Sequence, residues 1–282
     1  MNYLLIDLGG TKCRTTLRNQ KNEPVIIPHH VNVKVTDDVL KSIIDSIKPY
    51  NNYINKKTVI KIAVPGLVKK NKILQLPNLN IGEWDLAKEL KRLYYNKVLV
   101  YNDLEAAWHG EYTDKNFLLV YASTGVGGAI NGENIEFGRR ITINTNGEIK
   151  YHEIEKTLTK NDLEKNEFIL EHLTGGLALG KAAVIKGLQL GVNINKYGEE
   201  LDQYAHNNEI ARSVFEDAGS ILGKAIQAYA ETHKVKNVII GGSLGTNTYY
   251  FNAIKKQVKN INIQKSKFLN SSEAIFRGLL KL

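Results

Sequence analysis

Short apolar runs alternate with segments of helical periodicity along most of the chain. The apolar runs have the length of buried strands, and glycine, asparagine and proline positions typical of turns separate them. They predict strands at residues 3–7, 13–18, 24–28, 58–64, 97–101, 117–122, 126–131 and 236–240. Apolar spacings of three or four predict helices at 37–48, 84–95, 103–112, 162–173, 176–189, 208–233 and 271–281. Strands followed by helices indicate an α/β protein with largely parallel sheets.

Two of these strands are each followed by a glycine turn and a second apolar strand. The segments read YLLIDLGGTKCRTTL from residue 3 and FLLVYASTGVGGAI from residue 117. Hairpins of this kind predict an antiparallel addition to each sheet. Because the pattern recurs at the scale of a domain, we expect two related halves rather than a solenoid.

Composition narrows the class of protein. The 282 residues are enough for one large domain or two smaller ones, and 43% hydrophobic with 24% charged residues is typical of a soluble globular protein. No apolar run is long enough to span a membrane, and no signal region precedes Asp7. Cys13 is the sole cysteine, which excludes disulfides within the chain and thiolate metal cages. We therefore expect a cytoplasmic protein without a membrane partner.

The formal charge of +9 raises the possibility of a nucleic-acid partner. The lysines and arginines are scattered, however, and the densest clusters, at 68–72 and 255–259, are short and lack interleaved aromatic residues. A solvated lysine-rich surface explains them, so we expect no nucleic-acid partner. Attraction of a nucleotide's phosphates is equally compatible with this charge.

The glycine turns admit several interpretations. An ordinary hairpin turn is one. A dinucleotide fingerprint fails because Ile130 stands where its last glycine is required, and the near-match to a P-loop in GGLALGKA has Ala182 in place of the magnesium-binding hydroxyl. What remains is a pair of hairpin turns whose backbone amides can approach a phosphate closely. Asp7, beside the first turn, would then hold Mg²⁺ through water, since that ion prefers oxygen ligands.

A second candidate lies where the strand KVLV ends, at Asn102 and Asp103. Ligands of α/β folds collect at the carboxyl ends of strands, which favours a functional carboxylate there. Asp103 is also well placed to be only the N-cap of the following helix. An amide beside a carboxylate suits the recognition of a hydroxyl group, which favours the first interpretation slightly.

Six motifs, taken in order, resemble the ROK sugar kinases, and most closely the glucokinases and hexokinases among them. They are IDLGGTK, PGLV, PNL, YNDLEAAWHGE, STGVGGAI and VIIGGSLG, and the resemblance covers residues 1–130 and 174–282. It implies an α/β, two-domain, ribonuclease H-like (actin-like ATPase) fold with an interdomain cleft. The small domain would comprise 1–104 and 267–282, and the large domain 105–266. The resemblance also implies ATP and Mg²⁺ as cofactors, a small sugar as substrate, and a homodimer.

The same resemblance assigns individual positions. At the phosphates and magnesium it places Asp7, Gly9, Gly10, Thr11, Thr124, Gly125 and Gly127. Gly241 and Gly242 would border the adenosine. Asp103 would be the catalytic base, with Asn78, Asn102 and Glu148 contacting the sugar. Lys12 could touch phosphate or be a solvated lysine.

The chain departs from the family pattern in its sugar-binding part. After Gly147 and Glu148 the position of the family's histidine is Tyr151, and His152 comes one residue late. Glu171 is likewise displaced by one from the position of a further sugar-binding glutamate. Either short insertions restore His152 and Glu171 to the pocket, or the pocket takes a different sugar. The cysteine-rich zinc element of many bacterial members is absent, so we expect no structural zinc.

We therefore predict an ATP- and Mg²⁺-dependent hexokinase whose substrate is glucose or a close analogue. A kinase of N-acetylglucosamine or N-acetylmannosamine stays open because the sugar element is the divergent part. A catalytically silent sugar-binding regulator on the same scaffold is the third possibility. The first glycine loop begins too early for the DNA-binding domain that precedes it in family repressors, and the presence of Asp103 and both loops also favours an enzyme.

Overall fold

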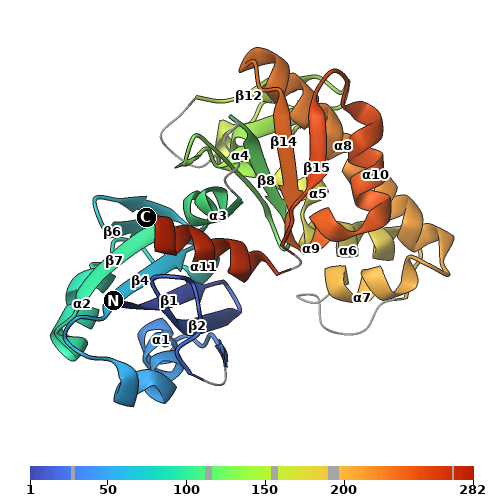
Figure 1. Ribbon diagram of the computed structural model, residues 1–282. Helices are drawn as coiled ribbons and strands as arrows, with labels where there is room; N and C mark the ends of the chain where they lie inside the picture. Colours follow the sequence, from blue (N-terminus) through green and yellow to red (C-terminus); the bar gives the residue numbers. More distant parts are fainter. Residues whose placement is uncertain (27–28, 112–115, 154–157, 190–196, 269) are drawn as a thin grey trace. The chain divides into compact units, whose positions relative to one another are not determined.

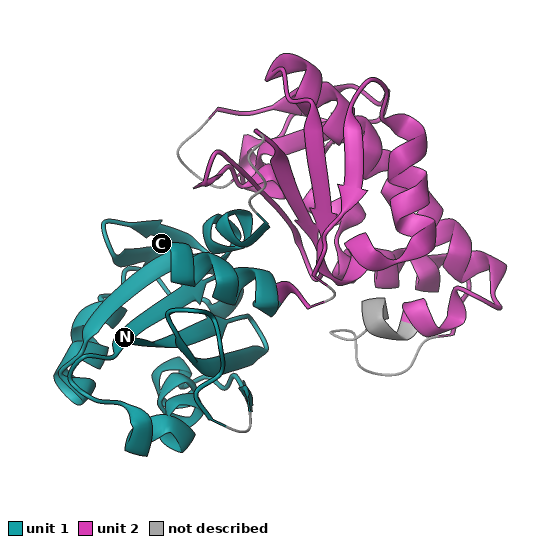
Figure 2. Cartoon of the chain, viewed as in Figure 1, with its two compact units in different colours: residues 1–112, 272–282 teal, residues 113–271 magenta. Residues whose placement is uncertain are grey.

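The computed structural model describes residues 1–26, 29–111, 116–153, 158–189, 197–268 and 270–282. The chain forms two compact units, residues 1–112 with 272–282 (unit 1) and residues 113–271 (unit 2), shown in Figures 1 and 2. Each unit is built around a mixed five-stranded sheet. None of the helices in the described ranges is both long and apolar enough to cross a lipid bilayer.

The two large sheets share one strand pattern. In unit 1 the order is β3-β2-β1-β4-β7, and in unit 2 it is β10-β9-β8-β14-β15. In both, the first three strands pair antiparallel and the last three pair parallel. The strands of unit 1 are β1 (Asn2–Leu8), β2 (Lys12–Asn19), β3 (Val31–Lys34), β4 (Val59–Val64) and β7 (Lys97–Asn102). Those of unit 2 are β8 (Leu118–Ala122), β9 (Val126–Ile130), β10 (Glu133–Asn134), β14 (Asn237–Gly241) and β15 (Asn262–Lys265). The two related halves predicted from the glycine hairpins are therefore confirmed at the level of sheet topology.

The sheet of unit 1 is buried on both faces. Successive side chains of a strand point to opposite faces, so Leu4, Ile6 and Leu8 share one face while Leu5 and Asp7 share the other. The first face packs against α1 (Val39–Ile47) and α2 (Leu86–Tyr94) in one apolar cluster. The second carries α3 (Asp103–Glu111) and α11 (Ser271–Lys281), whose Leu279 carbonyl accepts a hydrogen bond from buried Lys61. Smaller elements complete the unit: η1 (Lys48–Tyr53), β5 (Leu67–Lys69), β6 (Lys72–Gln75) and η2 (Pro77–Leu79).

Helices α3 and α11 approach each other backbone to backbone. A methyl group on Gly110 would lie 1.8 Å from the Ala274 carbonyl oxygen, and one on Gly278 would lie 1.6 Å from that of Ala106. Only glycine permits this contact, which holds α3 and the final helix in unit 1. The compact units accordingly divide after residues 112 and 271, a few residues beyond the expected boundaries at 104 and 266.

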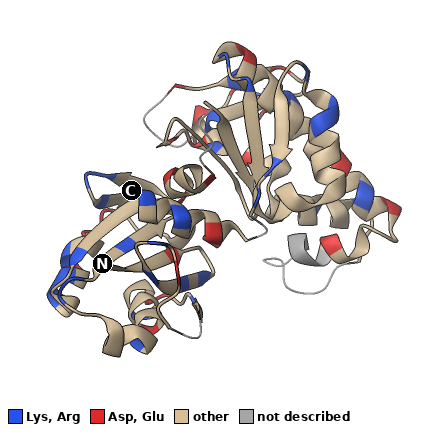
Figure 3. Ribbon diagram, viewed as in Figure 1, with Lys and Arg blue, Asp and Glu red and all other residues tan. Residues whose placement is uncertain are grey.

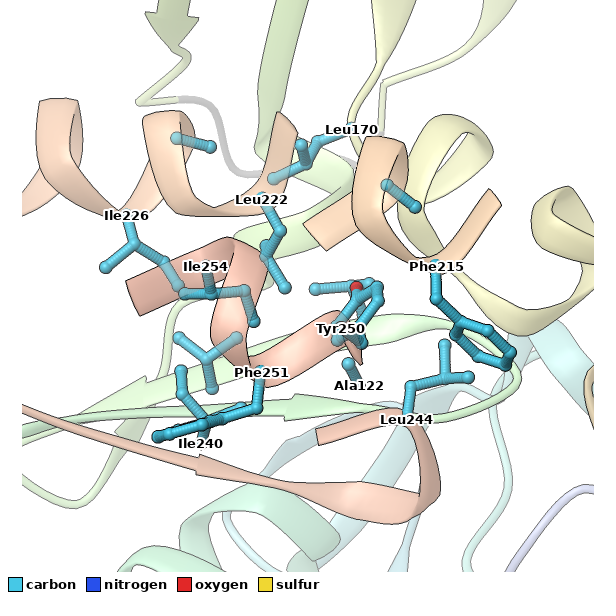
Figure 4. Close-up of a cluster of buried hydrophobic side chains, with 14 of the residues drawn as sticks. Ala122, Leu170, Phe215, Leu222, Ile226, Ile240, Leu244, Tyr250, Phe251 and Ile254 are labelled. Carbon is cyan, nitrogen blue, oxygen red and sulfur yellow. The ribbon is translucent and has the colours of Figure 1, made fainter. Parts of the chain in front are cut away.

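The core of unit 2 lies between its sheet and two helices, α8 (Glu209–Thr232) and α10 (Thr248–Gln257). Figure 4 shows Leu222 and Ile226 of α8 above Tyr250 and Ile254 of α10, with Ala122 at the end of β8 below. The Tyr250 hydroxyl is satisfied inside this core by the Thr174 carbonyl oxygen at 2.9 Å.

A second, three-stranded sheet of order β12-β11-β13 packs beside this core. Its strands and the surrounding short elements are β11 (Ile141–Asn144), β12 (Ile149–Tyr151), β13 (Glu167–Ile169), α4 (Phe137–Arg140), η3 (Lys160–Asp162), α5 (Glu171–Thr174), α6 (Gly176–Ile185), α7 (Tyr197–Tyr204) and α9 (Gly242–Thr246).

The strand predicted at 24–28 is wrong for the residues described there. Residues 24–26 contribute only an isolated bridge between Arg18 and Pro24, and residues 27–28 lie outside the described ranges. The third strand of the sheet is β3 instead. Proline has no amide hydrogen to donate to a ladder, whereas the alternating residues of β3 can pair along their whole length.

The helix predicted at 162–173 is also wrong. That range holds the end of η3, strand β13 and the start of the short helix α5. Asn166 adopts φ of +73°, a left-handed conformation that interrupts a helix, and β13 pairs with β11. Tertiary strand pairing thus overrides the local apolar spacing.

The predicted elements left 242–270 empty, although α9, α10 and β15 lie there. Helix α10 begins with a cap that is readable in the sequence, because the Asn247 side chain accepts a hydrogen bond from the Tyr250 amide. Lysine and arginine positions are spread along the ribbons of both units, with aspartate and glutamate positions among them (Figure 3).

Candidate active site

The carboxyl ends of three parallel strands form the edge of the unit 1 sheet where the predicted catalytic residues lie. Asp7 of β1 pairs with Ala63 of β4, and Val64 pairs with Asn102 of β7. This register brings Asp7 to the same edge as Asn102 and Asp103. Because ligands of open α/β sheets bind at this edge, the fold places the two carboxylates where chemistry is expected.

Asp7 is almost fully buried, with 4% of its surface exposed. One of its oxygens, Oδ2, accepts hydrogen bonds from the Ser272 hydroxyl and from Arg14 Nη1, the latter at 3.3 Å. Burial raises the pKa of the carboxyl, and Ser272 and Arg14 oppose that rise. The other oxygen, Oδ1, has no partner among the described residues.

This arrangement suits a hydrated magnesium ion. No group of three or more metal-binding side chains occurs within the described ranges. Mg²⁺ commonly keeps several waters and takes one or two protein carboxylates together with substrate phosphates. Asp7, whose Oδ1 has no partner in the described ranges, fits such an ion.

Asn102 is the N-cap of helix α3. Its Oδ1 accepts hydrogen bonds from the amides of Leu104 at 2.9 Å and Glu105 at 3.1 Å, and its Nδ2 donates to the Gly66 carbonyl at 2.8 Å. The side chain is 2% exposed. These bonds fix the start of α3 and with it the backbone of the next residue, Asp103.

Asp103 is therefore not needed as the helix cap. Its Oδ1 accepts from the Leu104 amide at 2.9 Å, and its Oδ2 has no partner among the described residues. Burial raises the pKa of the carboxyl to about 7. The charges of Asp7 and Glu105 add to the rise, and the backbone amides of Leu104 and of Asp103 itself oppose it. The group is half-buried. A reachable carboxylate with a pKa near neutrality has the properties of a general base.

The first glycine loop closes the β1–β2 hairpin. The Gly9 amide donates to the Lys12 carbonyl at 2.8 Å, while Gly10, Thr11 and Lys12 are exposed. Gly10 lies beside Asn78 of η2, since a methyl group on Gly10 would be 3.7 Å from the Asn78 Cβ. The fold thus brings the loop and the predicted sugar-binding asparagine together.

The second glycine loop joins β8 to β9 in unit 2. The Ser123 amide donates to the Gly125 carbonyl at 2.8 Å, and the Ser123 carbonyl accepts from the Gly176 amide at the start of α6. Thr124 is exposed at the tip and Gly125 is partly exposed. Gly127 lies within strand β9, opposite Tyr121.

Glu171 contacts this second loop directly. Its Oε2 accepts a hydrogen bond from the Val126 amide at 3.0 Å, and its Oε1 forms an ion pair with Arg139 Nε at 3.2 Å. A methyl group on Gly125 would lie 2.4 Å from Oε2. The absence of a side chain at Gly125 therefore lets the carboxylate reach the loop.

Gly241 and Gly242 lie at the end of β14, next to the end of β8. A methyl group on Gly241 would overlap the Tyr121 ring, and one on Gly242 would lie 2.3 Å from the Ala122 carbonyl oxygen. Gly242 also has φ of +83°, which other residues rarely adopt. The same edge of the unit 2 sheet therefore carries this pair and the second loop.

The three-stranded sheet separates the remaining sugar-binding candidates. Glu148 is exposed at the turn between β11 and β12, where its Oε2 accepts from the Asn144 side chain. His152 follows the far end of β12, with its amide on the Arg140 carbonyl and Nε2 2.9 Å from the Thr142 hydroxyl. Glu171, paired with Arg139, belongs to the same end as His152. The sheet brings those two together and leaves Glu148 at the opposite end.

Tyr151, at the position of the family's histidine, packs into an aromatic cluster. Its ring makes edge contacts with Tyr229 and His233 of the α8 end at centroid distances of 5.1 and 5.6 Å. Strand alternation therefore directs Tyr151 toward the core of unit 2 and His152 to the other face.

Three residues with evident roles were missed by sequence reasoning: Arg14, Ser272 and Arg139. Arg14 lies directly opposite Asp7 in the β1–β2 hairpin, so the predicted register could have identified it. Ser272 is 265 residues from Asp7 in sequence, and no local pattern connects them. Arg139 lies between residues 132 and 161, where the sequence predicted no strand or helix.

Comparison with known proteins defines the class. The sequence profile of the ROK family matches residues 3–274, and the chain belongs to this family. Its members include sugar kinases of the actin-like ATPase fold. These sugar kinases are phosphotransferases with an alcohol acceptor.

Particular relatives cover nearly the whole chain. An N-acetylmannosamine kinase from Pasteurella multocida (strain Pm70) is 22% identical over 279 residues, covering 91% of this chain and 86% of the relative. The ROK family glucokinase from Streptomyces griseus, in complex with glucose and AMPPNP, superposes with a TM-score of 0.74 at 17% identity over 100% of this chain and 98% of that one. The ROK hexokinase from Thermus thermophilus gives a TM-score of 0.68 at 18% identity, covering 99% and 97%.

Proposed function

We propose that the protein transfers the γ-phosphoryl group of ATP to the 6-hydroxyl of a hexose, glucose or a close analogue. The observation that carries the proposal is Asp103, held at the carboxyl edge of the unit 1 sheet with Oδ2 unpartnered among the described residues and a pKa of about 7. A sugar kinase needs one such carboxylate beside the acceptor alcohol.

Asp103 would act by accepting the proton of the sugar hydroxyl. That hydroxyl is a weak acid, and it becomes a good nucleophile only as its proton leaves while the bond to phosphorus forms. Oδ2 takes the proton, and Oδ1 stays on the Leu104 amide, so the carboxylate does not rotate away. The Asn102 cap keeps the Asp103 backbone in place during this transfer.

The nucleotide would bind the two glycine loops. Gly10 and Thr11 in unit 1 and Thr124 in unit 2 are exposed, and main-chain amides at such turns suit phosphate oxygens. Gly9 and Gly125 would complete the two loops, with the Gly9 amide holding the first turn through the Lys12 carbonyl. Lys12 and Gly127 flank these loops, and Gly241 and Gly242 would border the adenosine. Asp7 would hold Mg²⁺ through water. When bound, that ion would neutralise charge on the transferring phosphate.

The sugar would contact Asn78 and the remaining N–H of Asn102 in unit 1, and His152 and Glu171 in unit 2. Asn78 is supported by its place beside the first loop, since a methyl group on Gly10 would be 3.7 Å from the Asn78 Cβ. His152 and Glu171 are supported because both lie at the same end of the three-stranded sheet. Glu148 lies at the other end of that sheet and is not part of this proposed group.

A second candidate substrate is N-acetylmannosamine. It is favoured by the Pasteurella multocida relative and by Tyr151, whose ring is committed to the unit 2 core instead of the pocket. With Tyr151 in the core, the sugar-binding part lacks the family's histidine at this position, while Asp103 and both glycine loops are present.

A sugar panel tests the proposal. The purified protein is assayed with MgATP and glucose, mannose, N-acetylglucosamine or N-acetylmannosamine, and the phosphorylated carbon is identified by ³¹P NMR. We expect a 6-phosphate with a preference for glucose; preference for N-acetylmannosamine would establish the second candidate. Tight binding of a sugar without turnover of any would identify a silent regulator and overturn the kinase proposal.

A further inference from the structure

Ser272 lies where the chain re-enters unit 1 to form its last helix, and it is 1% exposed. Its hydroxyl donates to Asp7 Oδ2 and accepts from Arg14 Nη1 at 3.0 Å. Arg14 Nη1 also reaches Oδ2 directly at 3.3 Å. A neutral hydroxyl and a guanidinium thus converge on one oxygen of Asp7 and leave Oδ1 without a partner in the described part of the chain.

The residue after Ser272 fastens this arrangement to the sheet. Glu273 forms a two-point ion pair with Arg18, with Nη1–Oε1 at 3.0 Å and Nη2–Oε2 at 2.6 Å. The Arg18 guanidinium also lies over the Phe276 ring at 5.3 Å. Arg14 and Arg18 are four residues apart on β2 and so point to the same face, toward the first turn of α11. Ser272 is therefore held at a fixed distance from Asp7.

Ser272 is the second residue of α11, and its hydroxyl donates across the unit to the carboxylate of Asp7 on β1. Hydrogen bonds of this kind orient carboxylates that bind metals, and their loss weakens metal affinity by about 10–100-fold.

We propose that Ser272 is a positioning residue for Asp7: by holding Oδ2 it presents Oδ1 to the water shell of the magnesium ion that accompanies ATP. The inference rests on the proposed kinase function. Under this proposal helix α11 contributes to metal binding through Ser272, a role that neither glycine loop has. The proposal gives no new role to the sugar-binding side chains.

The test compares Ser272→Ala with Ser272→Thr, which keeps the hydroxyl, and with Ser271→Ala, the same change one residue earlier. The readout is binding of Mn²⁺ in the presence of ADP, followed by electron paramagnetic resonance without turnover. We expect about tenfold weaker Mn²⁺ binding for Ser272→Ala, and values close to wild type for the other two. In the kinase assay the half-saturating Mg²⁺ concentration should rise while the KM for sugar stays unchanged.

A further variant distinguishes the positioning of Asp7 from the mere attachment of helix α11 to the sheet. Arg18→Gln loosens α11 without removing a partner of Asp7, so it should lower the melting temperature and leave Mn²⁺ binding intact. If Ser272→Ala lowers only the melting temperature, or if Arg18→Gln weakens Mn²⁺ binding equally, the proposal is overturned. Should Ser272→Ala fail to fold, Ser272→Cys, with a weaker donor of similar size, takes its place.

The outcomes also distinguish the two levels of inference. A wild-type protein that binds Mn²⁺–ADP and phosphorylates a sugar, with a Ser272→Ala variant that does so equally well, removes only the role of Ser272. A wild-type protein that neither binds the metal nucleotide nor phosphorylates any sugar removes the proposed function as well.

Discussion

At the scale of single residues, the proposed site contains two carboxylates whose surroundings differ. Asp7 has its charge compensated by Arg14 and Ser272, whereas Asp103 is near backbone amides and the negative charge of Asp7, which raises its pKa. Two neighbouring acids in unlike environments can take different tasks, and here the compensated one suits cation binding and the other suits proton transfer.

The pKa of Asp103 predicts a pH dependence. A general base works only when it is deprotonated, so kcat/KM for the sugar should fall about tenfold per unit as the pH drops below about 7 and level off above it. Measurement of kcat/KM between pH 5 and 9 checks this. Glu105→Gln removes one of the charges that raise this pKa and should move the acid limb to lower pH. A profile flat through neutrality, or a limb moved to higher pH, would contradict the assignment.

Gly10 tests the first loop. The free protein has room for a small side chain there, because the nearest atom to an added methyl group is the Asn78 Cβ at 3.7 Å. Gly10→Val should therefore fold, yet its branched side chain should keep phosphate from the loop amides and raise the dissociation constant for ATP by about 10–100-fold. Calorimetric titration measures it. Nucleotide affinity equal to wild type would remove this loop from the site.

At the scale of elements, the site depends on where α3 begins and on what holds it there. Asn102 sets its first residue, and the contact with α11 sets its position. The residue types at both places are explained by this geometry: an amide that can donate and accept at once, and glycines where two backbones meet.

Gly110→Ala should disrupt this contact. The added methyl group would overlap the Ala274 carbonyl, a backbone atom that cannot move away cheaply, so we expect a loss of about 1–3 kcal/mol in the free energy of unfolding. Urea denaturation measures it. Gly82→Ala is the matched control, since nothing lies within 4 Å of its added methyl group, and it should be nearly neutral. Equal stability of the two variants would show that the helices are not in close contact.

The prediction from sequence succeeded where local pattern and tertiary structure agree. Strands β1, β2, β4, β7, β8, β9 and β14 and helices α1, α2, α3, α6, α8 and α11 lie where apolar spacing placed them, within a few residues. It failed where strand pairing decides, as at β13, or where a helix such as α10 carries its signal mainly in a cap. Ser272 was beyond reach because only the folded chain brings it to Asp7.

At the scale of the whole molecule, the two units differ in whether one continuous segment of the chain forms them. Unit 2 is continuous and has its own apolar core, whereas unit 1 is completed only by the last helix. Helix α11 covers the sheet face of Leu5 and Asp7 and receives bonds from Arg18 and Lys61. Unit 1 therefore cannot be complete until the final residues of the chain are in place.

Truncation after residue 271 tests this dependence. Loss of α11 exposes buried apolar surface on the unit 1 sheet, so unit 1 should lose its protection from hydrogen exchange while unit 2 keeps its own. Mass spectrometry of exchanged peptides measures both in one sample. Two results would contradict this expectation. One is that β1 and β4 keep the hydrogen-exchange protection that they have in the full chain, and the other is that α8 and α10 of unit 2 lose theirs together with unit 1.

Asp103 is proposed as the base of a sugar kinase, and the decisive variant is Asp103→Asn. The variant keeps the shape of the side chain and removes its ability to take a proton. With the sugar that the wild type prefers, we predict a fall in kcat of about 10²–10⁴-fold and unchanged dissociation constants for sugar and MgATP by calorimetry. Turnover near the wild-type rate would contradict the claim and leave Asp103 as no more than the first residue of a helix.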